Sequence, residues 1–361
     1  MSIERLMQPL AFRRGPAMGN RFMLAPLTNL QSHPDGRLSE DEFRWLTLRA
    51  KGGFGLVMTC ATHVHAQGQG FPGQLGIFGP EHEAGLTRLA GAIRDEGALS
   101  AVQLHHAGAR SPAELVGTPL APSDDRESGA RAMTEAEIET AREAFIAAAL
   151  RAERAGFHGV EVHGAHSYLI AQFLSPELNR RTDGYGGAPE KRARLLLEIL
   201  EGIRTRSGPD FQLGLRLSPE RYGQVLGEIR ELAQELFRTG WLDYLDMSLW
   251  DVGKEPHDEA YKGRSLLSYF AELSRGETRL GVAGKVMTAE RAAQALEEGA
   301  DFLLLGRAAI LHHDFPRRVR ADPAFRTAPL PVSIAHLAAE GLSPTFIDYM
   351  RNWKGFVEEA A

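Results

Sequence analysis

The feature that most constrains the fold is a unit that recurs seven times along the chain, in which a helix-like stretch ends at a glycine and a short apolar run follows. A glycine just past a helix provides a left-handed cap, and a short apolar run is typical of a buried parallel strand. The units therefore predict alternating helices and strands. Their glycines are Gly52, Gly97, Gly156, Gly208, Gly240, Gly276 and Gly299.

An eighth apolar run, FMLAP at 22–26, precedes the first unit. Eight strands that alternate with helices in a chain of 361 residues predict a (β/α)8 TIM barrel. A doubly wound sheet is disfavoured, because no G-x-G-x-x-G follows the first strand. We expect a single domain over 1–361, with an N-terminal cap at 1–20, a polar insertion after the third strand at 109–132 and a C-terminal extension at 325–361.

The composition of the chain disfavours several classes of protein function. The formal net charge of −6 argues against a nucleic-acid partner, and no run approaches the roughly 18 apolar residues of a membrane span. Cys60 is the single cysteine, which excludes an internal disulfide, an all-cysteine zinc site and an iron–sulfur cluster. The N-terminus lacks the apolar core of a signal peptide. We expect a cytoplasmic homo-oligomer that acts on a small molecule, with no nucleic-acid or membrane partner.

Glycines and polar residues follow the predicted strands, at the end of the barrel where such folds hold their active sites. The last two strand ends contain Gly284, Gly306 and Arg307. These suit a phosphate site, because glycine lets backbone N–H groups approach the anion and arginine binds it bidentately. Arg216 ends the fifth strand and needs an anionic or electron-rich partner. The alternative is that the glycines only shape turns and Arg307 is solvated.

Two histidines and a tyrosine, His163, His166 and Tyr168, follow the fourth strand. Neutral imidazoles can both donate N–H bonds to one carbonyl or nitro oxygen, and a phenol can deliver a proton. This set suits addition of hydride and a proton across a polarised double bond, with the hydride supplied by a cofactor. The rival is a metal-dependent barrel hydrolase, since histidine pairs also bind zinc. Against it, His63 and His65 follow the second strand instead of the first, and we expect no metal.

The stretch HGAHSYLIAQFLSPELNRRTDGYGG at 163–187, supported by LGIFGPEH, VQLHHAG, GLRLSPE and FLLLGRA, resembles the Old Yellow Enzyme family of FMN-dependent ene-reductases. The resemblance covers nearly the whole chain. It implies that NADPH or NADH reduces FMN, and that the alkene of an α,β-unsaturated carbonyl or nitro compound then takes hydride from flavin N5. By resemblance, His163 and His166 bind the activating oxygen of the substrate and Tyr168 donates the proton.

The resemblance also implies which residues hold FMN. The ring would lie against Pro26, Leu27, Thr28, Ala61, Gln103 and Arg216, and the phosphate against Gly284, Gly306 and Arg307. Trp250, after the sixth strand, would wall the substrate pocket; alternatively it only packs or lies exposed. Four positions depart from the family pattern. Gly184 stands where the motif usually has glutamate, and Leu30 stands where one bacterial branch has a substrate-binding tyrosine. Ser167 stands where the motif usually has glycine, and Thr28 replaces the redox-tuning cysteine of one bacterial branch.

Overall fold

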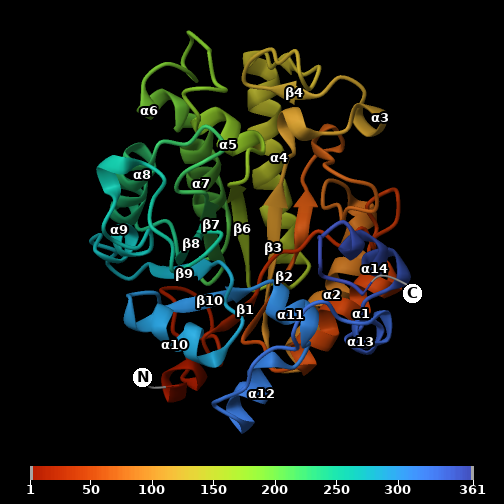
Figure 1. Ribbon diagram of the computed structural model, residues 1–361. Helices are drawn as coiled ribbons and strands as arrows, with labels where there is room; N and C mark the ends of the chain where they lie inside the picture. The colour runs from red at the N-terminus through yellow and green to blue at the C-terminus, as the bar shows by residue number, and fades with distance from the viewer. Residues whose placement is uncertain (1–2, 359–361) are drawn as a thin grey trace.

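The computed structural model describes residues 3–358 and shows a closed barrel of parallel strands (Figure 1). The order around the barrel is β1, β2, β3, β6, β7, β8, β9 and β10, and β10 pairs with β1 to close it. Every residue of β2, β3, β6 and β7 is buried, as expected for strands covered on both faces. The strands are β1 (Phe22–Leu24), β2 (Leu56–His63), β3 (Leu99–His105), β6 (Gly159–Gly164), β7 (Gln212–Leu217), β8 (Tyr244–Ser248), β9 (Arg279–Ala283) and β10 (Phe302–Leu305).

Helices alternate with these strands, so the predicted (β/α)8 barrel is confirmed. Thr134 and Glu137 form the capping box that their spacing predicted at the start of α4. Gly240 ends α8 in the left-handed conformation, whereas Gly52 does not cap α1 in this way because Gly53 takes the positive φ of +92°. The main helices are α1 (Glu40–Lys51), α2 (Glu83–Asp95), α4 (Glu135–Arg154), α7 (Arg194–Arg206), α8 (Leu226–Thr239), α10 (Ala289–Glu297) and α11 (Arg307–Leu311).

Shorter elements occupy the loops and the chain ends. The segment after β3 that we predicted as a polar insertion contains a small helix and two short paired strands, β4 (Leu120–Ala121) and β5 (Arg131–Ala132). None of the helices within 3–358 has the length and hydropathy to cross a bilayer. The other short elements are η1 (Ile3–Met7), η2 (Ala66–Gly68), η3 (Pro80–His82), η4 (Gly108–Arg110), η5 (Glu259–Tyr261), α3 (Ala113–Val116), α5 (Leu169–Leu174), α6 (Pro189–Arg192), α9 (Ser268–Ala271), α12 (Phe315–Ala321), α13 (Ile334–Ala339) and α14 (Pro344–Arg351).

Residues that precede β1 fill the N-terminal end of the barrel. Leu10 and Met18 exchange backbone hydrogen bonds, which folds this segment back on itself. Phe12 then packs inside the barrel against Tyr244 and Phe302, with ring centroids 5.8 and 6.1 Å away. Burying a side chain of this size contributes roughly 1.5–3 kcal/mol to stability. Only the C-terminal end of the barrel is therefore left to hold a site.

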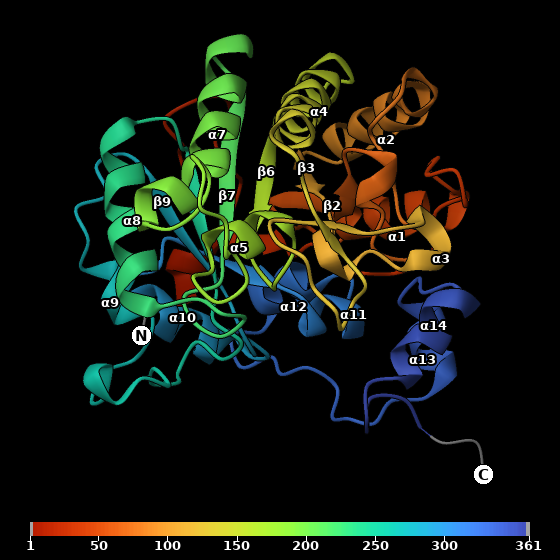
Figure 2. The same cartoon turned by 90° about the horizontal axis from the view of Figure 1, so that it is seen from above.

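The C-terminal extension packs beside the barrel, where α13 and α14 lie next to α1 (Figures 1 and 2). The ring of Trp45 in α1 meets that of Phe346 in α14 edge-on at 4.9 Å. His336 of α13 hydrogen-bonds the carbonyl of Leu311 at 2.8 Å, which ties α13 to the end of α11. The first two residues of the predicted N-terminal cap (1–2) and the last three of the C-terminal extension (359–361) lie outside the described residues.

Candidate active site

Two adjoining cavities lie at the C-terminal end of the barrel, with volumes of about 280 and 160 Å³. Both are lined by Pro26, Leu27, Arg216 and Trp353, so they form one elongated hollow. Cavities of about 400 and 430 Å³ lie elsewhere on the protein, but neither gathers these strand ends. The hollow brings together every residue that we predicted for the site. The larger cavity contains Pro26, Leu27, Thr28, Ala61, Gln103, His163, His166, Tyr168 and Arg216, and the smaller one adds Trp250, Gly284, Gly306 and Arg307.

The smaller cavity has the properties of an anion site. A Cβ atom at Gly284 would come within 2.7 Å of the backbone nitrogen of Asp251, so only glycine fits there. Beside Gly306 there is room, with Leu27 Cδ2 the nearest atom at 3.4 Å. Arg307 lines the cavity and forms no ion pair with any residue in 3–358. A guanidinium without an acidic partner, beside accessible backbone, fits the phosphate of FMN.

The larger cavity has a polar edge made by Gln103 and Arg216. The amide Nε2 of Gln103 donates to Glu161 Oε1 at 2.8 Å, which leaves the amide oxygen as an acceptor. Arg216 Nε lies 2.9 Å from Asp246 Oδ2; the angle is outside hydrogen-bond geometry, so the contact is an ion pair. Arg216 Nη2 also donates to Ser248 Oγ at 3.4 Å. An acceptor beside a donor matches the imide-like edge of a flavin ring, so the residues present fit FMN.

Two buried carboxyl groups lie beneath this edge inside the barrel. Burial and, to a lesser extent, the negative charge of Asp246 together raise the pKa of Glu161 to about 8, although Arg216 opposes the shift. Burial also raises the pKa of Asp246, although the neighbouring Arg216 opposes the shift. Near pH 7 the protein therefore holds a proton on Glu161 and an ion pair between Asp246 and Arg216. This arrangement keeps the floor of the cavity close to neutral.

The turn after β6 places His163 and His166 in contact. His163 Nε2 lies 2.9 Å from His166 Nδ1, and His166 Nε2 lies 2.8 Å from Ser248 Oγ. Burial lowers the pKa of both rings, that of His166 to about 3, so both are neutral. We expected both rings to donate N–H bonds to one oxygen, but here one ring donates to the other. At this separation the N–H of one neutral imidazole is hydrogen-bonded to the nitrogen of the other. His166 must therefore turn before both rings can donate to a common acceptor.

Tyr168 completes the cluster and lines the same cavity as Arg216. Its ring centroid lies 5.2 Å from that of His163 and 4.4 Å from that of His105. Its hydroxyl has no hydrogen-bond partner among the residues that the structure describes. Burial raises the pKa of Tyr168, although Arg110 opposes the shift. The phenol therefore keeps its proton at neutral pH and is available as a donor.

Several residues of the hollow were not anticipated from the sequence. Glu161 and Asp246 are acidic residues within apolar strands, a signal that marks an inward-facing charge once the barrel is assigned. Tyr349 and Trp353 come from the C-terminal segment, for which no sequence motif pointed to the site. Trp250 reaches only the rim, because its side chain is 56% exposed and its φ is +65°.

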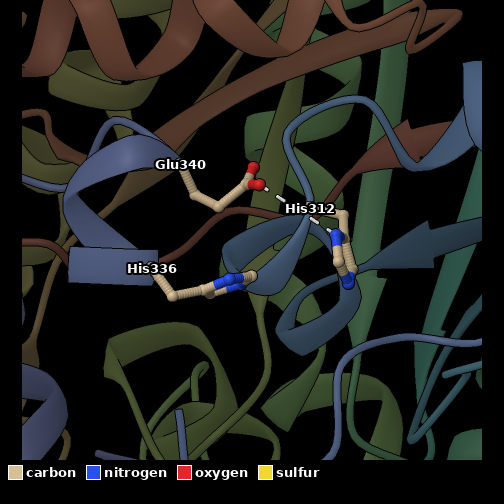
Figure 3. A group of neighbouring side chains, drawn as sticks. All are labelled: His312, His336 and Glu340. Carbon is tan, nitrogen blue, oxygen red and sulfur yellow. Dashed lines mark ion pairs between the residues drawn. The ribbon is translucent and has the colours of Figure 1, made fainter. Parts of the chain in front are cut away.

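Figure 3 shows one of two groups of metal-type ligands in the described chain, and none of its residues lines the hollow. This group consists of His312, His336 and Glu340, with His312 Nδ1 4.0 Å from Glu340 Oε1. The backbone N–H of Ala328 donates to His312 Nε2 at 2.8 Å. That bond leaves the ring proton on Nδ1, which therefore has no lone pair to offer a metal. The group ties the C-terminal extension to the barrel.

The chain matches the model of the NADH:flavin oxidoreductase / NADH oxidase family over residues 5–324. It is 36% identical over 327 residues to a probable NADH-dependent flavin oxidoreductase of Bacillus subtilis, covering 87% of each chain. An NADPH dehydrogenase of Halalkalibacterium halodurans is 37% identical over 320 residues, covering 86% of this chain and 92% of the relative. These matches show that the alternative prediction, a metal-dependent barrel hydrolase, is wrong.

Solved structures agree with the sequence comparisons. The old yellow enzyme homologue from Zymomonas mobilis superimposes with a TM-score of 0.80 at 28% identity, covering 94% of this chain and 99% of that chain. A 2-naphthoyl-CoA reductase complex gives a TM-score of 0.81 at 30% identity, but this chain spans only 52% of that protein. The protein is thus an FMN-dependent NAD(P)H oxidoreductase that belongs to the Old Yellow Enzyme family.

Proposed function

We propose that this oxidoreductase reduces the C=C bond of α,β-unsaturated carbonyl or nitro compounds, with Tyr168 as the proton donor. The observation that carries the proposal is the position of the Tyr168 hydroxyl. It belongs to a mostly buried side chain in the same cavity as His163 and His166, and no described residue occupies its hydrogen-bonding capacity. A phenol with a raised pKa transfers its proton only when a strong base develops beside it, as happens late in such an addition.

His163 and His166 would bind the oxygen that activates the alkene. Both are neutral, so they stabilise negative charge on that oxygen through N–H bonds without a full positive charge. His166 has to exchange its bond with His163 for one with the substrate, and Ser248 supports its other nitrogen meanwhile. Removing one such donor typically slows the chemical step by roughly 10²–10³-fold.

The remaining residues of the hollow would hold and orient the cofactor. Gln103 and Arg216 offer an acceptor and a donor to the polar edge of the ring. The apolar walls come from Pro26, Leu27 and Ala61 together with Thr28, while Gly284, Gly306 and Arg307 surround the phosphate. When bound, FMN supplies the hydride, which no side chain can donate.

Product analysis tests the proposed reaction. The yellow enzyme is incubated without oxygen with NADPH and 2-cyclohexenone, and the products are separated by gas chromatography. We expect cyclohexanone, formed in proportion to the NADPH consumed, because the site protonates carbon after polarising the carbonyl oxygen. Formation of 2-cyclohexen-1-ol, or NADPH consumption only when oxygen is admitted, would overturn the proposal.

A further inference from the structure

Arg110 is a basic residue that touches the proposed proton donor. It ends η4, in the loop after β3, and its guanidinium carbon lies 4.8 Å from the ring centroid of Tyr168. Its Nη1 donates to the backbone oxygen of His166 at 2.7 Å. The side chain is exposed to solvent but is held over the site by these two contacts. An exposed arginine that is only solvated has no such fixed position.

Two of the three lysine and arginine side chains that line the hollow are paired with an acidic residue. Arg216 is paired with Asp246, and Lys285 with Asp251. At the phosphate end, the unpaired cation is Arg307. Arg110, which contacts the ring of Tyr168 from outside the two cavities, also forms no ion pair in the described part of the chain. The phosphate of FMN would neutralise the charge of Arg307, whereas Arg110 does not line the cavity that would hold this phosphate.

The charge of Arg110 extends over the catalytic cluster. Burial is the main cause of the lowered pKa values of His163 and His166, and Arg110 lowers both further. It also opposes the raised pKa of Tyr168. Among the described residues, no aspartate or glutamate lines the larger cavity. The substrate end of the hollow therefore has an uncompensated positive charge, which favours an anionic ligand.

We propose that Arg110 binds a carboxylate on the substrate, so that the preferred substrates are activated alkenes bearing an anionic group. This inference rests on the proposed function, because it concerns the same site. A guanidinium has five N–H donors, and only one is used by the carbonyl of His166. The others can form a bidentate bond with a carboxylate. The activating oxygen lies at His163 and His166 while the carboxylate lies over Tyr168, so the alkene spans the space between them.

A pair of matched substrates separates charge from reactivity. The ketone trans-4-oxo-2-pentenoate carries a carboxylate, and its methyl ester keeps the same enone but carries no charge. KM and kcat are measured for both with the wild-type holoenzyme and with Arg110→Gln and Arg110→Lys. Each variant is compared with wild type on the same substrate, which cancels the difference in intrinsic reactivity. Arg126→Gln is the control, because it removes an exposed arginine of the same insertion that, unlike Arg110, contacts neither Tyr168 nor His166 in the described structure.

We expect Arg110→Gln to raise KM for the acid at least about tenfold, which corresponds to about 1.4 kcal/mol. KM for the methyl ester should stay the same, Arg110→Lys should recover part of the loss, and Arg126→Gln should match wild type. Equal changes for the acid and the ester would overturn the proposal and indicate a merely structural role. If wild type converts neither substrate, the proposed function has failed, and the inference fails with it.

The pyrophosphate of NAD(P)H is a second source of negative charge at the same mouth. Flavin reduction by NADPH is therefore followed separately, by the loss of flavin absorbance in a stopped-flow instrument. We expect the NADPH concentration dependence of this step to be the same in wild type and Arg110→Gln. A weakened NADPH dependence with an unchanged KM for the acid would assign Arg110 to the reductant and overturn its assignment to the substrate.

Discussion

At the scale of single residues, Ser167 departs from relaxed backbone geometry. It has a φ of +60°, as does the preceding His166. A non-glycine residue in this region costs roughly 1–2 kcal/mol. The Ser167 hydroxyl forms no hydrogen bond within 3–358 that would offset the cost. The turn that carries His166 and Tyr168 is therefore strained at its centre, as functional turns often are.

Replacing Ser167 with glycine should stabilise the protein. Relief of the left-handed strain exceeds the roughly 0.4–1 kcal/mol by which glycine favours the unfolded chain. We expect a rise of about 1 °C in the thermal midpoint, given the size of the protein, with FMN held at a fixed saturating concentration. Ser167→Ala is the control, since alanine keeps the strain. A midpoint for Ser167→Gly at or below that of Ser167→Ala would show that the conformation is not costly.

At the scale of elements, the inward faces of β6 and β8 make stability depend on pH. The folded pKa of Glu161 is raised to about 8 by burial, above the ordinary value near 4.3 of an unfolded glutamate. The unfolded chain therefore loses this proton first as pH rises. The stability that protonated Glu161 contributes is complete below about pH 4 and is lost as pH rises to about 8.

The variant Glu161→Gln should remove this pH dependence while keeping an oxygen that accepts the Gln103 amide. We expect its free energy of unfolding to improve relative to wild type between pH 5 and 8, by on the order of 1 kcal/mol per pH unit. Urea unfolding of the FMN-free proteins at several pH values measures this. Glu177→Gln, at an exposed carboxyl, should show no trend. A constant difference between Glu161→Gln and wild type would mean that Glu161 is already ionised in the folded protein.

The sequence predicts an element well where neighbouring residues determine its position, and poorly where contacts with distant segments do. Seven strands could be located because each apolar run follows a glycine within a few residues. The eighth, β1, was located from its apolar run alone and ends at Leu24, two residues earlier than expected. The orientation of Glu161 was not predictable from its strand alone, since it depends on which face lines the closed barrel. The contact of Arg110 with Tyr168, and the place of Trp353 in the hollow, arise only when distant segments meet.

At the scale of the whole molecule, the two ends of the barrel have different tasks. The N-terminal end is filled by the segment that contains Phe12, which stabilises the fold without chemistry. The C-terminal end gathers strand ends and the extension into one hollow, with the unpaired Arg307 at one end and Tyr168 at the other. In the proposed assignment, the cofactor and substrate sites would share one space, so reductant and substrate would use the same mouth in turn.

The measurement that tests this account most directly follows the two half-reactions separately in wild type and Tyr168→Phe. Stopped-flow absorbance records flavin reduction by NADPH, and then flavin reoxidation by 2-cyclohexenone without oxygen. We expect flavin reduction to be unchanged and reoxidation by the alkene to slow by roughly 10²–10⁴-fold, the usual contribution of a positioned acid. Equal losses in both half-reactions, or an unchanged rate of reoxidation, would contradict the role of Tyr168 as the proton donor.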